Sequence, residues 1–262
     1  MTTNRSGRAL TTPMLRAALF GLSVPITAGL LSIGCETPSG GIAVSEEQIA
    51  ATNGYKTKNG YKTKNGFSLV EGLSQPGTFA PTTEFMSTAD GRMQISYLVK
   101  CALPDDEQIV KFDSRGNKYT FEGLIGLAPE WKTGACGQTC QEWVSACLLA
   151  LTNGAGVHIP VWLVADHPAV GFGQQKDYPK QEGSFFGNLF ISPPKAFYCG
   201  GRDYLNRPAT GRIGSAQVDT TYSNIYGAGG LCANHCTPAD RPYEKDGYKA
   251  CSGWNRVVTV WR

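Results

Sequence analysis

Histidine is scarce in this chain of 262 residues, which contains only His158, His167 and His235. A cysteine nucleophile that needs an imidazole partner must therefore use one of these three residues. An excess of positive charge is also lacking, because the formal charge of +3 belongs to three arginines in residues 1–34, and residues 67–262 hold 17 basic and 18 acidic side chains. Nucleic-acid binding depends on such an excess, so we expect no nucleic-acid partner.

The amino terminus has the plan of an export signal. Residues 1–16 carry arginines and no acid, and residues 17–34, AALFGLSVPITAGLLSIG, are uncharged. A basic start followed by an apolar run is typical of such signals. The run reaches the roughly 18 residues that a membrane span requires. Pro25 and the small residues make it a poor span, although a retained anchor stays an alternative.

The chain also lacks a partner for one of its cysteines, because their number, nine, is odd. The first, Cys35, ends LSIGC, which resembles the lipobox of bacterial lipoproteins, although Ser32 departs from the commonest pattern and Leu31 lies one place further back. The resemblance implies cleavage before Cys35 and a lipid on its sulfur. Ordinary cleavage that leaves a free Cys35 thiol is the alternative. We therefore expect a signal peptide over residues 1–34.

The other eight cysteines predict four disulfides, because an even number of cysteines in an exported chain is typical of a disulfide framework. Sequence alone leaves 105 pairings open. These residues are Cys101, Cys136, Cys140, Cys147, Cys199, Cys232, Cys236 and Cys251. We expect one globular domain over residues 67–262, in which the bridges reinforce a hydrophobic core.

A repeat separates the lipid site from this domain. Residues 53–67, NGYKTKNGYKTKNGF, repeat the unit NGYKTK. Stacked turns of a short solenoid would need about three or more repeats with a buried face. We therefore interpret residues 35–66 as a flexible tether, whose four lysines lie near the bilayer and attract anionic lipid headgroups.

The first half of the domain predicts a helix and a hairpin. Apolar residues at a spacing of four indicate a helix near residues 86–101 that stops at Leu103-Pro104, although MQISYLV would also suit a strand. Alternating apolar residues on both sides of DSRGN, residues 113–117, predict a β-hairpin.

The clearest element is an amphipathic helix over residues 140–152. Thr139 and Glu142 have the spacing of a capping box. Trp143, Cys147 and Leu151 share the apolar face, whereas Gln141, Glu142 and Ser145 lie off it.

Strand patterns follow the helix. They cover residues 157–165, 185–191, 196–199 and 256–261. Pro160 predicts a sheet edge for the first of them. The whole pattern predicts an α+β fold, in which one prominent helix packs on short, mostly antiparallel strands with long disulfide-held loops.

Three segments carry a family resemblance. They are GLIGLAPEW (123–131), QEWVSACLLALTN (141–153) and EGSFFGNLF (182–190). Together they resemble an uncharacterised family of exported, cysteine-rich proteins of myxobacteria and related soil bacteria, over roughly residues 90–262. Members often carry a short asparagine-glycine repeat ahead of the domain, as this chain does. The family has no assigned activity, so the resemblance implies no catalytic residues.

Cysteine chemistry offers two candidate sites. GACGQTCQEWVSA resembles the nucleophile segment of papain-like peptidases, but two residues separate Cys140 from Trp143, where that family has its aromatic residue directly after the cysteine. CANHC, residues 232–236, reverses the last two residues of the haem-attachment motif, and zinc would use Cys232, His235, Cys236 and Cys251. Disulfides are the simpler interpretation of both segments in an exported chain. We therefore expect no metal and no cofactor.

Acidic residues and aromatic residues offer two more candidate sites. Hydrolysis by paired carboxylates would use two residues from the set Glu142, Asp166, Glu182 and Asp203. Glu182 lies beside GSFFGN, and its simpler interpretation is a solvated loop acid. Aromatic residues crowd the last third and could stack on sugar rings or a partner protein, or fill a core short of aliphatic residues. They are Tyr198, Tyr204, Tyr222, Tyr226, Tyr243, Tyr248 and Trp254.

The sequence thus favours a lipid-anchored protein of the cell envelope, held at the periplasmic face or the cell surface. A binding or structural module with an envelope polysaccharide or protein partner is the leading hypothesis. The alternative is a secreted-type hydrolase that acts on wall or extracellular polymer.

Overall fold

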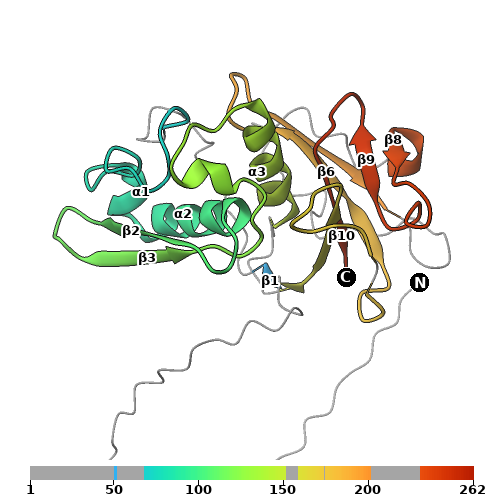
Figure 1. The fold of residues 1–262 in the computed structure, drawn as a ribbon, viewed down its shortest axis with the longest axis horizontal. Helices are drawn as coiled ribbons and strands as arrows, with labels where there is room; N and C mark the ends of the chain where they lie inside the picture. Colours follow the sequence, from blue (N-terminus) through green and yellow to red (C-terminus); the bar gives the residue numbers. More distant parts are fainter. Residues whose placement is uncertain (1–49, 52–67, 152–158, 174, 202–230) are drawn as a thin grey trace, which may run out of the picture. The chain divides into compact units, whose positions relative to one another are not determined.

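In a computed structural model of the chain, the structure describes residues 50–51, 68–151, 159–173, 175–201 and 231–262 (Figure 1). The chain divides into two compact units, Met1–Ala43 and Val44–Arg262, and every described residue belongs to the second. The predicted signal, Cys35 and the NGYKTK repeat lie outside the described residues. Within the described ranges, no helix is long and apolar enough to cross a bilayer.

The predicted helix near residues 86–101 is confirmed as α2, Ala89–Ala102, which follows the short helix α1, Glu84–Ser87. Thr88 caps α2 because its hydroxyl accepts a hydrogen bond from the Gly91 N–H at 2.9 Å. The helix ends before Leu103, since a residue that precedes proline disfavours the helical backbone. The strand alternative for this segment is wrong.

The predicted hairpin is also confirmed, as strands β2, Gln108–Phe112, and β3, Lys118–Glu122, which pair antiparallel. Asp113 organises its turn, because one carboxylate oxygen accepts the backbone N–H groups of Arg115 and Asn117, both at 2.9 Å. These bonds, and above all the one from the Asn117 side-chain amide, lower the pKa of Asp113 to about 2.

Lys111 projects from the buried face of this hairpin. It is only 5% exposed, and its ammonium donates a hydrogen bond to the Gln75 carbonyl at 2.6 Å. Burial lowers the pKa of Lys111 from 10.5 to about 8, because the charged form loses its hydration. The hairpin therefore buries a lysine whose side chain loses its proton at a lower pH than an exposed lysine does.

We expect the stability of the protein to rise between about pH 8 and pH 10.5, because in this window the unfolded chain binds a proton at Lys111 that the folded chain does not. The rise is at most about 3 kcal/mol, at 1.36 kcal/mol per pH unit. Lys111→Met should abolish it, and Lys118→Met, at an exposed position of β3, should leave it intact. Urea unfolding at pH 7.5 and pH 10 measures this; an equal rise in Lys111→Met would contradict the assignment.

The main sheet has four antiparallel strands in the order β5-β10-β6-β7. They are β5, Trp162–Ala165, β6, Gln181–Asn188, β7, Lys195–Gly200, and β10, Val257–Trp261. As Pro160 predicted, the segment after it lies at a sheet edge. Pro160 itself belongs to β4, Ile159–Pro160, which pairs with β1, Ala50–Ala51, from the predicted tether segment.

The predicted strand at residues 185–191 begins earlier and ends earlier in the structure. β6 stops at Asn188. The side-chain carbonyl of Asn188 accepts a hydrogen bond from the Phe190 N–H at 2.9 Å, and this bond turns the chain. All eight residues of β6 are buried, which requires a cover on both faces of the sheet.

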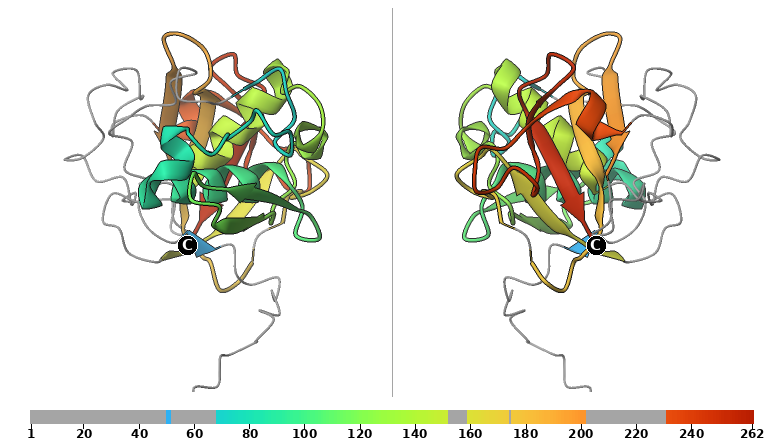
Figure 2. Two further views of the ribbon diagram at one scale, coloured as in Figure 1. Left: turned by 90° about the vertical axis from the view of Figure 1, so that its left-hand side faces the viewer. Right: turned by 90° about the vertical axis from the view of Figure 1, so that its right-hand side faces the viewer.

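The two faces have different covers (Figures 1 and 2). Phe185, Val258 and Val260 belong to the same buried cluster as α3, whereas the adjacent residues Phe186 and Val257 belong to a second cluster. Neighbouring residues of a strand face opposite sides. The second cluster includes the hairpin of β8, Cys236–Pro238, and β9, Tyr248–Cys251. The helix and the small hairpin therefore enclose the sheet between them.

Helix α3 spans Gln138–Ala150, so it starts two residues before the predicted position. The predicted capping box is wrong: Gly137 is the N-cap, it makes no side-chain capping bond, and Thr139 is exposed inside the helix. The Cys136–Cys140 disulfide and the bond from the Gln141 side-chain amide to the Cys136 carbonyl, at 2.9 Å, hold the start of the helix instead.

The apolar face of α3 is as predicted: Trp143, Cys147 and Leu151 are buried. The polar side was misjudged, because Glu142 and Ser145 are buried too. The Ser145 hydroxyl accepts the Leu189 N–H at 2.9 Å, and the Glu142 carboxylate accepts the Gln138 amide at 2.7 Å. The helix is therefore enclosed on more sides than its sequence indicated.

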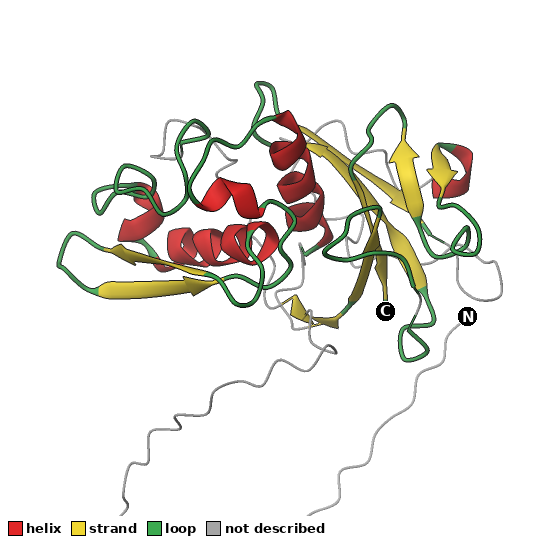
Figure 3. Cartoon of the chain, viewed as in Figure 1, coloured by secondary structure: helices red, strands yellow, loops and turns green. Residues whose placement is uncertain are grey.

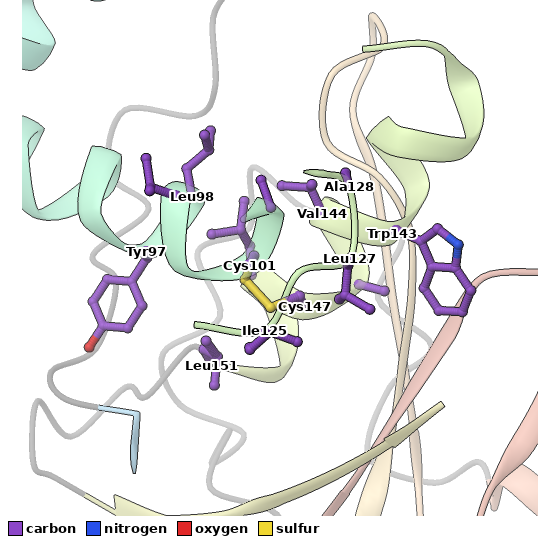
Figure 4. Packing of buried hydrophobic residues seen from close by; sticks show 14 of the residues in the cluster. Tyr97, Leu98, Cys101, Ile125, Leu127, Ala128, Trp143, Val144, Cys147 and Leu151 are labelled. Carbon is purple, nitrogen blue, oxygen red and sulfur yellow. A yellow bond between two sulfur atoms is a disulfide. The ribbon is translucent and has the colours of Figure 1, made fainter. Parts of the chain in front are cut away.

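Four disulfides join the eight cysteines of the domain. The pairs are Cys101–Cys147, Cys136–Cys140, Cys199–Cys232 and Cys236–Cys251. The first ties α2 to α3 within the core (Figure 4). The short 3-10 helices η3, Pro129–Lys132, and η5, Cys232–Asn234, complete the described elements. The predicted α+β class is confirmed, with few helices and mostly antiparallel strands (Figure 3).

Candidate functional site

The cysteine-nucleophile hypothesis fails at Cys140, because its sulfur is bonded to Cys136 and offers no thiol. His167 packs edge-on against Trp143, with ring centroids 5.0 Å apart, and the Arg256 guanidinium lies 5.6 Å from the same indole. Burial is the main cause that lowers the pKa of His167. The negative charge of Glu130 raises this pKa, and the positive charge of Arg256 lowers it further. His167 thus belongs to the packing around α3, and His158 lies outside the described residues.

The four candidate acids have different environments. Glu142 is bonded to Gln138 within α3, and Asp166 is an exposed residue after β5. Glu182 is fully buried within β6, so the expectation of a solvated loop acid is wrong. Its pattern misled because a strand buried on both faces gives no alternation of polar residues. Asp203 lies outside the described residues.

The cysteines of the CANHC segment are in disulfides, and His235 beside them is exposed. Cys199, which the sequence did not associate with this segment, is the partner of Cys232. Among the described residues, one group of sulfurs is arranged closely enough for a metal ion, and it consists of Cys199, Cys236 and Cys251. The local motif therefore identified part of a larger sulfur cluster.

Only some of the aromatic residues singled out in the last third are accessible. Tyr198 is buried, whereas Tyr248 and Trp254 are half-buried. Tyr243 is 45% exposed. The other three, Tyr204, Tyr222 and Tyr226, lie outside the described residues. Tyr198 therefore fills the core, whereas Tyr243 reaches the surface.

Tyr243 belongs to one of two stacked aromatic pairs, which together we name the β5-edge aromatic surface. The Phe172 ring stacks on Tyr243 with centroids 6.4 Å apart and an interplanar angle of 22°. Trp162 stacks on Tyr178 at 6.4 Å and 29°. Trp162, Phe172 and Tyr178 are half-buried, so each ring keeps an accessible part.

The loop after β5 positions these rings by folding back on the strand. The Ala165 N–H donates to the Gly171 carbonyl at 2.8 Å, and the Trp162 indole N–H donates to the Gly173 carbonyl at 2.7 Å. Both glycines have positive φ, 72° and 149°, which side chains rarely adopt. Gly171 and Gly173 thus fix the direction of Phe172 between them.

Close packing holds Phe172 from behind. A Cβ added to Gly247 would lie 2.9 Å from the Val164 methyl and 3.1 Å from the Phe172 ring, which leaves no room for a side chain. Gly247, which lies just before β9, therefore packs directly against the Phe172 ring. Phe172 is thus packed between the loop after β5 and the residue before β9.

Charged groups lie next to Tyr243 in the chain. The Lys249 ammonium contacts both carboxylate oxygens of Asp240 at 2.8 Å, and the hydrogen bond with Asp240 is the main cause that raises the pKa of Lys249. Arg241 contacts Glu244 at 3.2 Å. Exposed ion pairs of this kind contribute little to stability.

Sequence reasoning identified Tyr243 and missed Trp162, Phe172 and Tyr178. The segment GFG, residues 171–173, carried a usable signal, because an aromatic residue between two glycines is expected in a tight loop. The stacking itself could not be predicted, since Phe172 and Tyr243 are far apart in the chain.

Comparison with known proteins adds no relative: no family model, no curated protein and no solved structure matches this chain.

Proposed function

We propose that this chain is a lipid-anchored protein of the cell envelope whose domain binds an envelope polysaccharide at the β5-edge aromatic surface. The four disulfides indicate an oxidising compartment outside the cytoplasm, which agrees with an exported protein. The proposal rests on one observation above the others: the exposed Tyr243 ring is stacked on Phe172, which lies in the loop after β5.

A saccharide suits this surface for two physical reasons. Sugar rings have flat faces of C–H groups, which pack against aromatic faces while their hydroxyl groups need polar partners around the rim. The surface offers the rings of Tyr243 and Phe172, and the exposed ion pair of Asp240 and Lys249 offers acceptors and donors. The formally balanced charge of the domain is compatible with a neutral or weakly charged polymer.

We expect Tyr243→Ala to weaken binding to insoluble peptidoglycan sacculi by about two- to tenfold, which corresponds to the 0.5–1.5 kcal/mol typical of one aromatic contact. Tyr243→Phe keeps the ring and should bind almost as the unchanged protein does. Co-sedimentation measures both, and Val70→Ala at another exposed apolar position is the control. Unchanged binding of Tyr243→Ala, or no binding of the unchanged protein to sacculi or to insoluble chitin, would contradict the proposal.

The anchor has a separate test. The basic start, the uncharged run and LSIGC support cleavage before Cys35 and acylation of its sulfur. Mass spectrometry of the membrane fraction should find a lipid-modified peptide that begins at Cys35, and Cys35→Ser should move the protein to the soluble fraction. An unmodified mature amino terminus at any other residue would contradict lipid anchoring and leave the sugar proposal standing.

A further inference from the structure

Two of the four disulfides lie against each other. Cys199–Cys232 joins β7 to η5, and Cys236–Cys251 joins β8 to β9. The Cys199 and Cys236 sulfurs belong to different disulfides and are 3.5 Å apart. The sulfurs of Cys199, Cys236 and Cys251 all lie within 4.8 Å of one another, and that of Cys232 is 2.04 Å from Cys199. Three of the four sulfurs are therefore close neighbours, and the fourth, that of Cys232, is bonded to one of them.

The spacing of the Cys199, Cys236 and Cys251 sulfurs is similar to that of a thiolate metal site. Zinc binds four cysteine sulfurs at about 2.3 Å, which places the sulfurs about 3.8 Å apart. The 3.5 Å between Cys199 and Cys236 is already close to that value. The sulfurs of each bonded pair, Cys199 with Cys232 and Cys236 with Cys251, separate once their disulfide is reduced.

The surroundings of the cluster differ from one cysteine to the next. Cys199, Cys232 and Cys251 are buried among apolar neighbours that include Phe186 and Val257, whereas Cys236 is partly exposed. A reductant therefore reaches the cluster at Cys236. Apolar surroundings disfavour free thiolates, and a bound cation compensates for their charge.

We propose that reduction converts these two disulfides into a Cys₄ site for a thiophilic divalent cation such as Zn²⁺, formed by Cys199, Cys232, Cys236 and Cys251. One thiolate of a dithiol reductant attacks Cys236 and expels the Cys251 thiolate, which gives a mixed disulfide with Cys236. The second thiol of the reductant then releases Cys236 and closes the reductant's own disulfide. The Cys236–Cys251 bond has thereby accepted two electrons. The Cys236 thiolate then attacks Cys199 at 3.5 Å and expels the Cys232 thiolate, which carries the reduction to the buried pair.

A second dithiol molecule reduces the new Cys199–Cys236 bond in the same way. The protein has then gained four electrons and four protons, and two dithiols have become two disulfides. Binding of one Zn²⁺ releases the four protons from the thiols. The metal replaces two covalent links between the same four segments, so β7, η5, β8 and β9 stay joined in reducing surroundings. This inference does not depend on sugar binding.

The experiment reduces the purified protein with a phosphine in the absence of oxygen and titrates it with Co²⁺ and then Zn²⁺. We expect one Co²⁺ per chain, a thiolate-to-cobalt charge-transfer band, and displacement of that Co²⁺ by one Zn²⁺. Cys199→Ser and Cys251→Ser should each weaken Co²⁺ binding at least tenfold. Cys101→Ala/Cys147→Ala removes two thiols elsewhere in the reduced protein and should keep the band.

Alkylation of the unchanged protein covers the case in which the variants fail to fold. In the reduced protein, Zn²⁺ should slow alkylation of Cys199, Cys232, Cys236 and Cys251 at least tenfold, and it should change the rates at Cys136 and Cys140 little. Absence of the charge-transfer band, less than one tightly bound ion per chain, or protection that maps to other cysteines would overturn the proposal.

Discussion

Trp143→Ala is expected to lower the free energy of unfolding by about 3 to 5 kcal/mol, the cost typical of a core aromatic cut to alanine. Trp143 is 5% exposed on α3, contacts His167 edge-on, and lies beneath the Arg256 guanidinium. Figure 4 shows its indole directed away from the Cys101–Cys147 bond, toward the strands of the main sheet. The substitution therefore removes packing between α3 and the sheet, and Arg256 and His167 lose their apolar partner.

Thr139→Ala is the matched control, because Thr139 lies on the same helix but is exposed and makes no capping bond. Its effect should stay within about 0.5 kcal/mol, as for most surface substitutions. Urea unfolding followed by circular dichroism measures both variants. If Trp143→Ala kept its unfolding midpoint and lost binding to sacculi, α3 would carry the ligand site and the β5-edge aromatic surface would not.

Removal of the Cys101–Cys147 disulfide should have a comparable effect. The bond joins residues 46 positions apart, and the chain-entropy description predicts that its loss destabilises the fold by about 4 kcal/mol. Both sulfurs are fully buried between α2 and α3, so Cys101→Ala/Cys147→Ala also creates a cavity. We expect this variant to unfold at a clearly lower urea concentration than the unchanged protein.

Cys136→Ala/Cys140→Ala provides the comparison, because its bond spans only 4 positions and the same description gives about 2 kcal/mol. It also removes the link that fixes the start of α3, so the first turn of the helix should exchange its amide hydrogens faster. Equal losses in the two variants, or a larger loss in the second, would show that the link between α2 and α3 contributes less than its long loop predicts.

Local chemistry made several elements readable from the sequence. The turn DSRGN has an aspartate whose carboxylate accepts two backbone N–H groups within five residues, so neighbouring residues suffice to specify the hairpin. Leu103-Pro104 ended α2 for a steric reason that involves adjacent residues. The capping box failed because α3 begins at Gln138, so Thr139 lies inside the helix, and the Cys136–Cys140 bond links a residue before the helix to its first turn.

The sequence by itself determined the α+β class, the apolar face of α3, the hairpin, and the even set of eight cysteines, because each depends on spacing along the chain or on simple parity. Only the tertiary structure decided which sulfurs pair, that Glu182 is buried, and that Phe172 meets Tyr243. These features depend on contacts between segments far apart in the chain. The last strand, β10, gives the clearest case: its pattern predicted a strand, but its place at the centre of the sheet exists only because β5 and β6 pair on its two sides.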